Sequence, residues 1–132
     1  MLNTTGPRAI DHIWILLSIL FTACSQLLIK WQVSHVGSLP AGTAERLHYL
    51  FELFTRPWII AALVSTFLAG VTWMVALGKF ELSYAFPFYA LNFLIVFLAG
   101  IFLFSETFTL AKVAGLSLIL VGVVVLASNS AR

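Results

Sequence analysis

The sequence contains few charged residues. Only 9% of its 132 residues are Asp, Glu, Lys or Arg, whereas 61% are hydrophobic. Soluble domains usually carry about a quarter charged residues, so the main solvent of this chain is expected to be lipid. The seven Lys and Arg residues are scattered singly between apolar runs and form no patch or stripe. This argues against nucleic-acid binding, although the formal net charge is +2.

Cysteine is nearly absent, since Cys24 is the single one in the sequence. One cysteine cannot form an internal disulfide, and it has no neighbouring ligands for a zinc site. The sequence also lacks a paired nucleophile and base, a phosphate-cradling glycine loop and a nucleotide motif. We therefore expect no metal, no cofactor and no enzymatic activity, and we interpret Cys24 as small apolar filler.

Acidic residues and histidine are missing from the middle of every long apolar run. Glu81 and Glu106 lie at the ends of runs, where a solvated or capping role is the default expectation. A proton relay within the bilayer normally requires a titratable side chain at depth. The sequence therefore argues against a proton relay, and without a nucleotide motif it also argues against an ATP-driven pump.

Four apolar runs of membrane length make up most of the chain. They extend over Ile13–Ile29, Pro57–Leu77, Leu82–Phe104 and Leu110–Ala127. Each is close to the roughly 20 residues that a helix needs to cross about 30 Å of hydrocarbon, and none shows the period-2 alternation of a membrane β-barrel. We predict an all-α membrane protein whose residues 1–132 form one domain. The predicted spans are about 13–30, 57–78, 82–104 and 108–127.

The first run also loosely resembles a lipoprotein signal peptide. Arg8 precedes it, and Phe21-Thr-Ala-Cys24 lies inside it. A lipidated cysteine is normally followed by a soluble domain, whereas three further spans follow here. We expect this run to be a retained helix.

A short amphipathic helix over about residues 43–55 is predicted between the first two spans. Its apolar residues recur at i, i+3, i+4 and i+7 and are Leu47, Leu50, Phe51 and Phe54. Polar and charged residues fall on the opposite side, which is typical of a helix lying in the headgroup layer. The tight connections around Lys79 and Ser105 make the last three spans antiparallel neighbours.

Basic residues divide almost evenly between the two faces of this topology. One face carries Arg8, Lys79 and Arg132, and the other carries Lys30, Arg46, Arg56 and Lys112. The positive-inside rule needs an excess on one side to choose an orientation. The near tie is incidental if Lys30 and Lys112 only snorkel from helix ends; otherwise the chain inserts both ways or is oriented by a partner.

Polar residues of the first span share one helix face. They follow a spacing of three or four and are Ser18, Thr22, Ser25, Gln26 and Lys30. Serine in a membrane helix commonly bonds to a neighbouring helix, and this is our interpretation of Ser18 and Ser25. Gln26 and Lys30 place an amide and an ammonium group one turn apart, and we expect them to bind an anionic headgroup near the membrane edge.

In the third span, Tyr89 and Asn92 lie at mid-depth close to Pro87, which removes one backbone hydrogen bond. We expect this face of the helix to line a cavity. Trp73 of the second span is a less specific candidate, because the small residues around it also suit close helix packing.

The last run contains Gly115-Leu-Ser-Leu-Ile-Leu-Val-Gly122-Val. It resembles the G-L-x-L-I-x-x-G-V pattern of the four-helix members of the drug/metabolite transporter superfamily, which includes small multidrug resistance proteins and EamA-like domains. Ser105-Glu106-Thr107 is similar to the acidic connection that precedes this pattern. The resemblance implies that Gly115 and Gly122 serve dimer packing. In the multidrug branch a glutamate of the first helix binds protons and cationic drugs, and the matching position here is Thr22, which disfavours proton-coupled export.

Two other segments resemble a second branch of this superfamily. Ser25-Gln26-Leu-Leu-Ile-Lys30 and Ala85-Phe-Pro87-Phe-Tyr-Ala-Leu-Asn92-Phe93 are similar to segments in the small subunits of the flippase for 4-amino-4-deoxy-arabinose linked to undecaprenyl phosphate. This implies a multi-pass protein of the bacterial inner membrane that moves a polyprenyl-phosphate-linked sugar between leaflets. The implied assembly is a homodimer or a pair with a similar small subunit. The candidate substrate-binding residues are Thr22, Gln26, Lys30, Trp73, Tyr89 and Asn92.

Three functions from different classes stay open at this point. A lipid-linked sugar flippase requires polar side chains of the first and third spans to face one shared passage. A small exporter of solutes or cationic drugs would release protons on binding a hydrophobic cation. A non-transporting accessory subunit would use its polar stripes only to join helices. The sugar, the energy source and the choice between homodimer and heterodimer are left undetermined.

Overall fold

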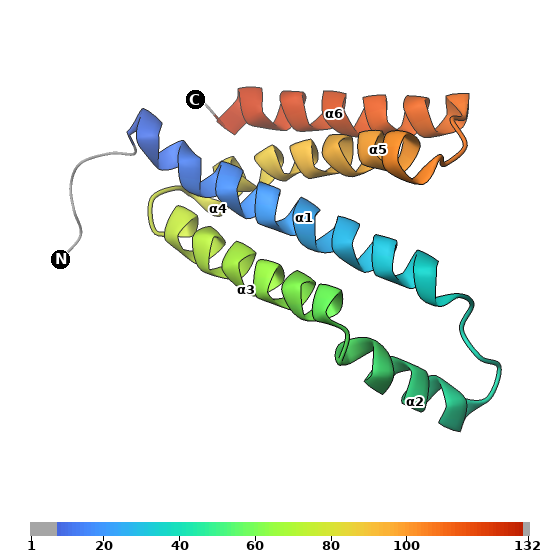
Figure 1. Ribbon diagram of the computed structural model, residues 1–132. Helices are drawn as coiled ribbons and strands as arrows, with labels where there is room; N and C mark the ends of the chain where they lie inside the picture. Colours follow the sequence, from blue (N-terminus) through green and yellow to red (C-terminus); the bar gives the residue numbers. More distant parts are fainter. Residues whose placement is uncertain (1–7, 131–132) are drawn as a thin grey trace.

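A computed structural model describes residues 8–130, and all the regular structure in this part of the chain is helical (Figure 1). The helices are α1 (His12–Val36), α2 (Thr43–Phe54), α3 (Pro57–Leu77), α4 (Leu82–Ala85), α5 (Ala90–Phe104) and α6 (Leu110–Ser130). Short 3₁₀ turns precede α1 and join α4 to α5. The helices long and apolar enough to cross a membrane cover Ala9–Val36, Pro57–Leu77, Leu82–Phe104 and Leu110–Asn129. The predicted all-α fold with four spans is confirmed.

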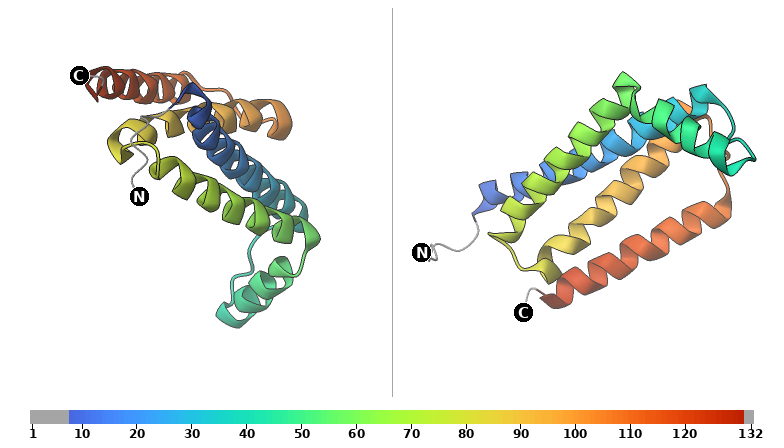
Figure 2. Two further views of the ribbon diagram at one scale, coloured as in Figure 1. Left: turned by 90° about the vertical axis from the view of Figure 1, so that its left-hand side faces the viewer. Right: turned by 90° about the horizontal axis from the view of Figure 1, so that it is seen from below.

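The four spans form an open row in the order α3, α1, α5 and α6 (Figures 1 and 2). α1 packs along α3 on one side and contacts α5 on the other. α6 stands at the outer edge, where it contacts α5 and the α4 end of the third span, and no residue of its most apolar stretch is buried. Most of the α6 surface is therefore left to lipid or to another protein.

Proline determines where two of these elements begin or break. Pro57 occupies the first turn of α3, where its missing N–H costs no helix hydrogen bond. Pro87 lies inside the third span, where a proline cannot donate to the preceding turn. The chain responds there with a 3₁₀ turn, Phe86–Tyr89, between α4 and α5.

Small and hydroxylated residues hold α1 against α3. Ala62, Ala69 and Ala76 of α3 are buried and let the two backbones approach closely. Three hydroxyls cross the interface: Ser18 Oγ donates to Ala69 O (2.9 Å), Ser65 Oγ donates to Phe21 O (2.8 Å), and Ser25 Oγ lies 2.6 Å from Thr66 Oγ1. The interpretation of Ser18 and Ser25 as residues that join helices is confirmed.

The packing is tight at one end of the row and loose at the other. Ile15, Ile19, Ala76, Phe80 and Ala85 form a buried cluster where the start of α1 meets the end of α3 and α4. From there α1 and α3 diverge from α5 and α6 towards the C-terminal end of α1 (Figure 1). Any groove between the arms is therefore expected at this second end.

α2 lies beyond the N-terminal end of α3, and α3 is the span that it contacts most (Figure 1). Its apolar residues Leu47, Leu50, Phe51 and Phe54 are all exposed, as a helix lying on a lipid surface requires. Its place in the headgroup layer stays a prediction. Arg132, which entered the count of basic residues, lies outside the described residues.

Candidate binding groove

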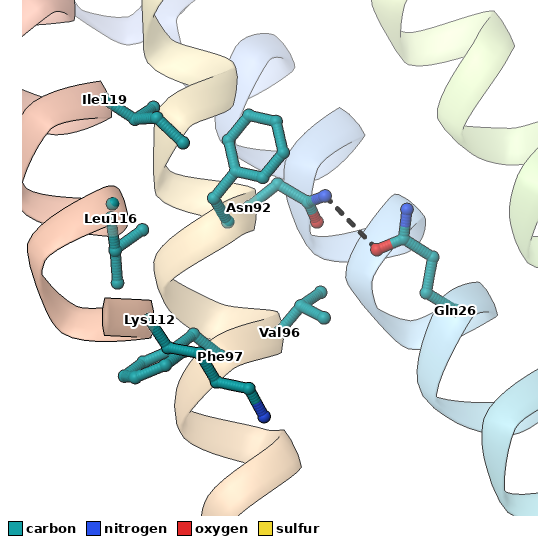
Figure 3. A pocket seen from close by; sticks show the side chains of 9 residues that line it. Gln26, Asn92, Val96, Phe97, Lys112, Leu116 and Ile119 are labelled. Atoms are coloured by element: carbon teal, nitrogen blue, oxygen red, sulfur yellow. Dashed lines mark hydrogen bonds between the residues drawn. The ribbon is translucent and has the colours of Figure 1, made fainter. Parts of the chain in front are cut away.

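A pair of primary amides joins α1 to α5 (Figure 3). Asn92 Nδ2 donates to Gln26 Oε1 at 3.2 Å, which brings together two residues 66 positions apart. Asn92 is 8% exposed, and its buried Oδ1 accepts no hydrogen bond within the described chain. Two amides joined by one bond keep an amide oxygen and amide protons to spare, whichever way each group is oriented. The pair thus combines a buried amide, Asn92, that keeps hydrogen-bonding capacity with an exposed one, Gln26.

The amide pair opens into a groove between α5 and α6 of about 590 Å³. The residues that line it are Gln26, Asn92, Phe93, Val96, Phe97, Lys112, Gly115, Leu116 and Ile119. Figure 3 shows Leu116 and Ile119 of α6 on the side of the groove opposite Gln26. Apart from the two amides and Lys112, the walls are apolar. We define the binding groove by these nine residues.

A smaller cavity of about 140 Å³ continues the binding groove towards the loose end of the spans, since it shares Gln26 and Val96 with it. An ion pair borders this cavity. Lys30 Nζ lies 3.2 Å from Glu106 Oε1, and the two side chains are 53% and 43% exposed. Lys30 follows Gln26 by one helical turn, so the structure places an amide pair and an ion pair in succession along α1.

Glu106 is the residue that sequence reasoning missed, because a carboxylate between two spans suggested only a solvated or capping role. Ser105 ends α5 with a left-handed φ of 51°, and the Glu106 N–H then donates to Gly100 O at 3.0 Å. Glu106 Oε2 lies 3.1 Å from the point where a Cβ on Gly100 would stand. The sequence offered one sign of this arrangement. Gly100 lies one turn before the end of an apolar run, and its missing side chain leaves room for a neighbouring group such as the Glu106 carboxylate.

Tyr89 and Trp73 lie apart from the amide pair. Tyr89 Oη is 2.5 Å from Ser18 Oγ, and the Trp73 ring packs edge-on against the Tyr89 ring with centroids 4.7 Å apart. Neither residue lines the binding groove or its smaller continuation. The structure therefore brings Gln26, Asn92 and Lys30 together and leaves the aromatic pair in the helix interface. A substrate-binding role for Tyr89 and Trp73 stays a prediction.

Thr22 and the two glycines of α6 also fall outside the amide and ion pairs. Thr22 Oγ1 donates to Ser18 O at 2.8 Å within α1. No atom of the described chain lies within 4 Å of a Cβ built on Gly115 or Gly122, so both glycines face open space. Their proposed part in dimer packing is untested by a single copy of the chain. Within residues 8–130, no group of three or more His, Cys, Asp or Glu side chains is arranged to hold a metal ion.

Known proteins similar to the chain are named as probable flippase subunits. No model of a known protein family and no solved structure matches it. The chain is 33% identical over 124 residues to the "probable 4-amino-4-deoxy-L-arabinose-phosphoundecaprenol flippase subunit ArnF" of Photorhabdus laumondii, which covers 85% of this chain and 92% of the relative. It is 34% identical over 117 residues to the corresponding ArnE subunit of Pseudomonas aeruginosa UCBPP-PA14, which covers 88% of this chain and 96% of the relative. A second ArnF, from Enterobacter sp. strain 638, is 33% identical over 116 residues. At this identity and coverage, the chain belongs to the family of the ArnE and ArnF flippase subunits.

Proposed function

We propose that the chain is a subunit of a flippase that moves a polyprenyl-phosphate-linked sugar across the bacterial inner membrane. The observation that carries this proposal is the Gln26–Asn92 pair, in which the buried Asn92 Oδ1 has no partner within the described chain and both residues line an apolar groove. A sugar hydroxyl both donates and accepts hydrogen bonds, so it matches the spare capacity of the two amides. The names printed for the relatives supply the class of substrate.

The groove suits a substrate with one polar and one apolar end. Only the headgroup of a lipid-linked sugar has to leave water, because its polyprenyl tail stays in hydrocarbon. The apolar walls of the binding groove include Phe93, Val96 and Leu116. In this proposal they contact the polyprenyl tail and form no hydrogen bonds with the sugar. Binding and release of the headgroup break no covalent bond, so the proposed role is transport rather than catalysis.

A second small subunit completes the groove in this proposal. Four spans in an open row enclose little space, and the exposed α6 borders the groove directly. Gly122 lies on α6 outside the groove with open space in front of it, whereas Gly115 lines the groove itself, and small residues are the usual contact points between membrane helices. We propose that α6 packs against a similar small subunit, which is either a second copy or a related chain.

Two other hypotheses receive less support. Proton-coupled export of the multidrug type uses a glutamate of the first helix, whereas the matching position here is Thr22, whose hydroxyl is engaged within its own helix. A purely accessory subunit needs no unused polar groups, and the hydroxyls of Ser18 and Ser25 already join α1 to α3. The spare capacity of Asn92 favours a bound ligand over a purely accessory role.

Headgroup translocation in liposomes tests the proposal. The chain is reconstituted alone and with a second small subunit of the family, and the arrival of a labelled lipid-linked sugar in the opposite leaflet is measured. We expect Asn92→Leu to slow translocation about tenfold, which corresponds to about one lost hydrogen bond to the substrate. Thr72→Val is the matched control, because Thr72 lies outside the groove and its hydroxyl bonds only within α3, and its rate should equal that of the wild type. No translocation by the wild-type pair, or an unchanged rate for Asn92→Leu, would overturn the proposal.

A further inference from the structure

The backbone directs the Glu106 side chain back across α5 to Lys30. The left-handed turn at Ser105 and the bond from the Glu106 N–H to Gly100 O fix the start of this side chain. The missing side chain of Gly100 then gives the carboxylate room to lie across the helix. The backbone hydrogen bond and the space at Gly100 together place the Glu106 carboxylate beside Lys30.

The ion pair is accessible and can be opened by a ligand. Both side chains are about half exposed, and exposed ion pairs add little to stability because water stabilises the separated charges. The other charged group near this end of the binding groove is Lys112, whose Nζ donates to Thr107 O at 3.1 Å. An entering headgroup therefore meets two opposite charges, Lys30 and Glu106, one turn beyond the amide pair.

We infer that Lys30 and Glu106 separate to bind a zwitterionic headgroup, with the Lys30 ammonium on the phosphate and the Glu106 carboxylate on a protonated amine of the sugar. This inference rests on the proposed function and assigns to two residues the recognition of the amine and the phosphate that the relatives' names already contain. A zwitterion supplies an opposite charge to each partner, so neither Lys30 nor Glu106 is left unpaired. A headgroup with a phosphate and no amine places its negative charge beside an uncompensated carboxylate. That repulsion gives the site its selectivity, since specificity commonly needs an element that disfavours the wrong ligand.

Binding of a defined set of lipids to the purified protein tests the inference. The set contains a short polyprenyl phosphate joined to a 4-amino sugar, its 4-hydroxy analogue and its N-acetylated analogue, each measured by native mass spectrometry. We expect the wild type to prefer the amine about tenfold, as the loss of one charge-assisted hydrogen bond implies. Glu106→Gln should bind all three with nearly equal affinity. Lys30→Gln should weaken the binding of all three, because all carry the phosphate.

The double variant Lys30→Glu/Glu106→Lys separates recognition from structure. It keeps an ion pair between the same positions but exchanges the two charges. If the pair only ties α1 to the loop before α6, the double variant should regain the affinity and amine preference of the wild type, and that result would overturn the inference. We expect it instead to restore thermal stability in detergent without restoring the preference for the amine.

Failure of this inference differs from failure of the proposed function. Equal binding of the amino and hydroxy sugars by the wild type overturns the zwitterion site and leaves a lipid-linked sugar as the substrate. Absence of binding for every polyprenyl-linked sugar, with intact fold, overturns both.

Discussion

Replacing Asn92 by leucine should separate binding from stability. The side chain is 8% exposed, makes one hydrogen bond, at 3.2 Å to Gln26, and buries an oxygen that has no partner in the described chain. Leucine has a similar size and no polar atoms. The substitution therefore removes one bond and one unsatisfied oxygen together.

The two effects differ in size. A hydrogen bond between membrane helices contributes about 0.6 kcal/mol on average, because the separated helices also find partners. A buried polar atom without a partner costs about 1–3 kcal/mol. We therefore expect Asn92→Leu to be more stable than the wild type by roughly 0–2 kcal/mol, while its affinity for the lipid-linked sugar falls about tenfold.

The assay combines two measurements on the same preparation. Reversible unfolding in mixed micelles gives the free energy of unfolding, and native mass spectrometry gives the fraction of protein that retains lipid. Gln26→Leu removes the other amide of the same hydrogen bond and serves as the variant matched to Asn92→Leu. A loss of more than about 1 kcal/mol for Asn92→Leu would exceed the usual value of such a bond and would show that the amide pair is a structural joint. If Asn92→Leu kept full lipid binding, the proposed role of Asn92 in binding the sugar would be refuted.

Three further substitutions have definite expectations. Ser18→Ala should lower the free energy of unfolding by about 1 kcal/mol, because the hydroxyl bonds to α3 and to Tyr89, and lipid binding should stay unchanged. Gly100→Val should abolish the preference for an amino sugar as Glu106→Gln does, although the carboxylate is retained, because the new side chain occupies the place where the carboxylate lies. Gly122→Leu should leave the monomer's stability unchanged, since no atom lies within 4 Å of a Cβ there, and should reduce the dimer fraction seen by native mass spectrometry.

The sequence predicted the helices well because the length of an apolar run is a local property. The second span was expected at 57–78 and α3 covers Pro57–Leu77, and the predicted interfacial segment, residues 43–55, corresponds to α2 at Thr43–Phe54. Proline at the first turn of α3 gave a sharp boundary. The break at Pro87 also followed from the chemistry of one residue.

The arrangement of the helices could not be read in the same way. A helix surrounded by lipid is apolar on every side, so its sequence does not indicate which face meets a neighbour. For this reason the sequence suggested that Tyr89 and Asn92 belong to one polar face, whereas Tyr89 bonds to Ser18 and Asn92 bonds to Gln26. Glu106 was missed because its position depends on the left-handed turn at Ser105.

Photo-crosslinking of the substrate tests the central claim most directly. A lipid-linked sugar analogue with a photoreactive group on the sugar is added to the reconstituted protein, and the modified residues are mapped by peptide mass spectrometry. We expect labels on the amide pair itself, Gln26 and Asn92, which line the binding groove. A cavity of about 500 Å³ that shares no lining residue with the binding groove, bordered by Cys24 and Leu103, serves as the internal comparison. Labels confined to Cys24 and Leu103 would contradict the assignment of the sugar to the Gln26–Asn92 groove.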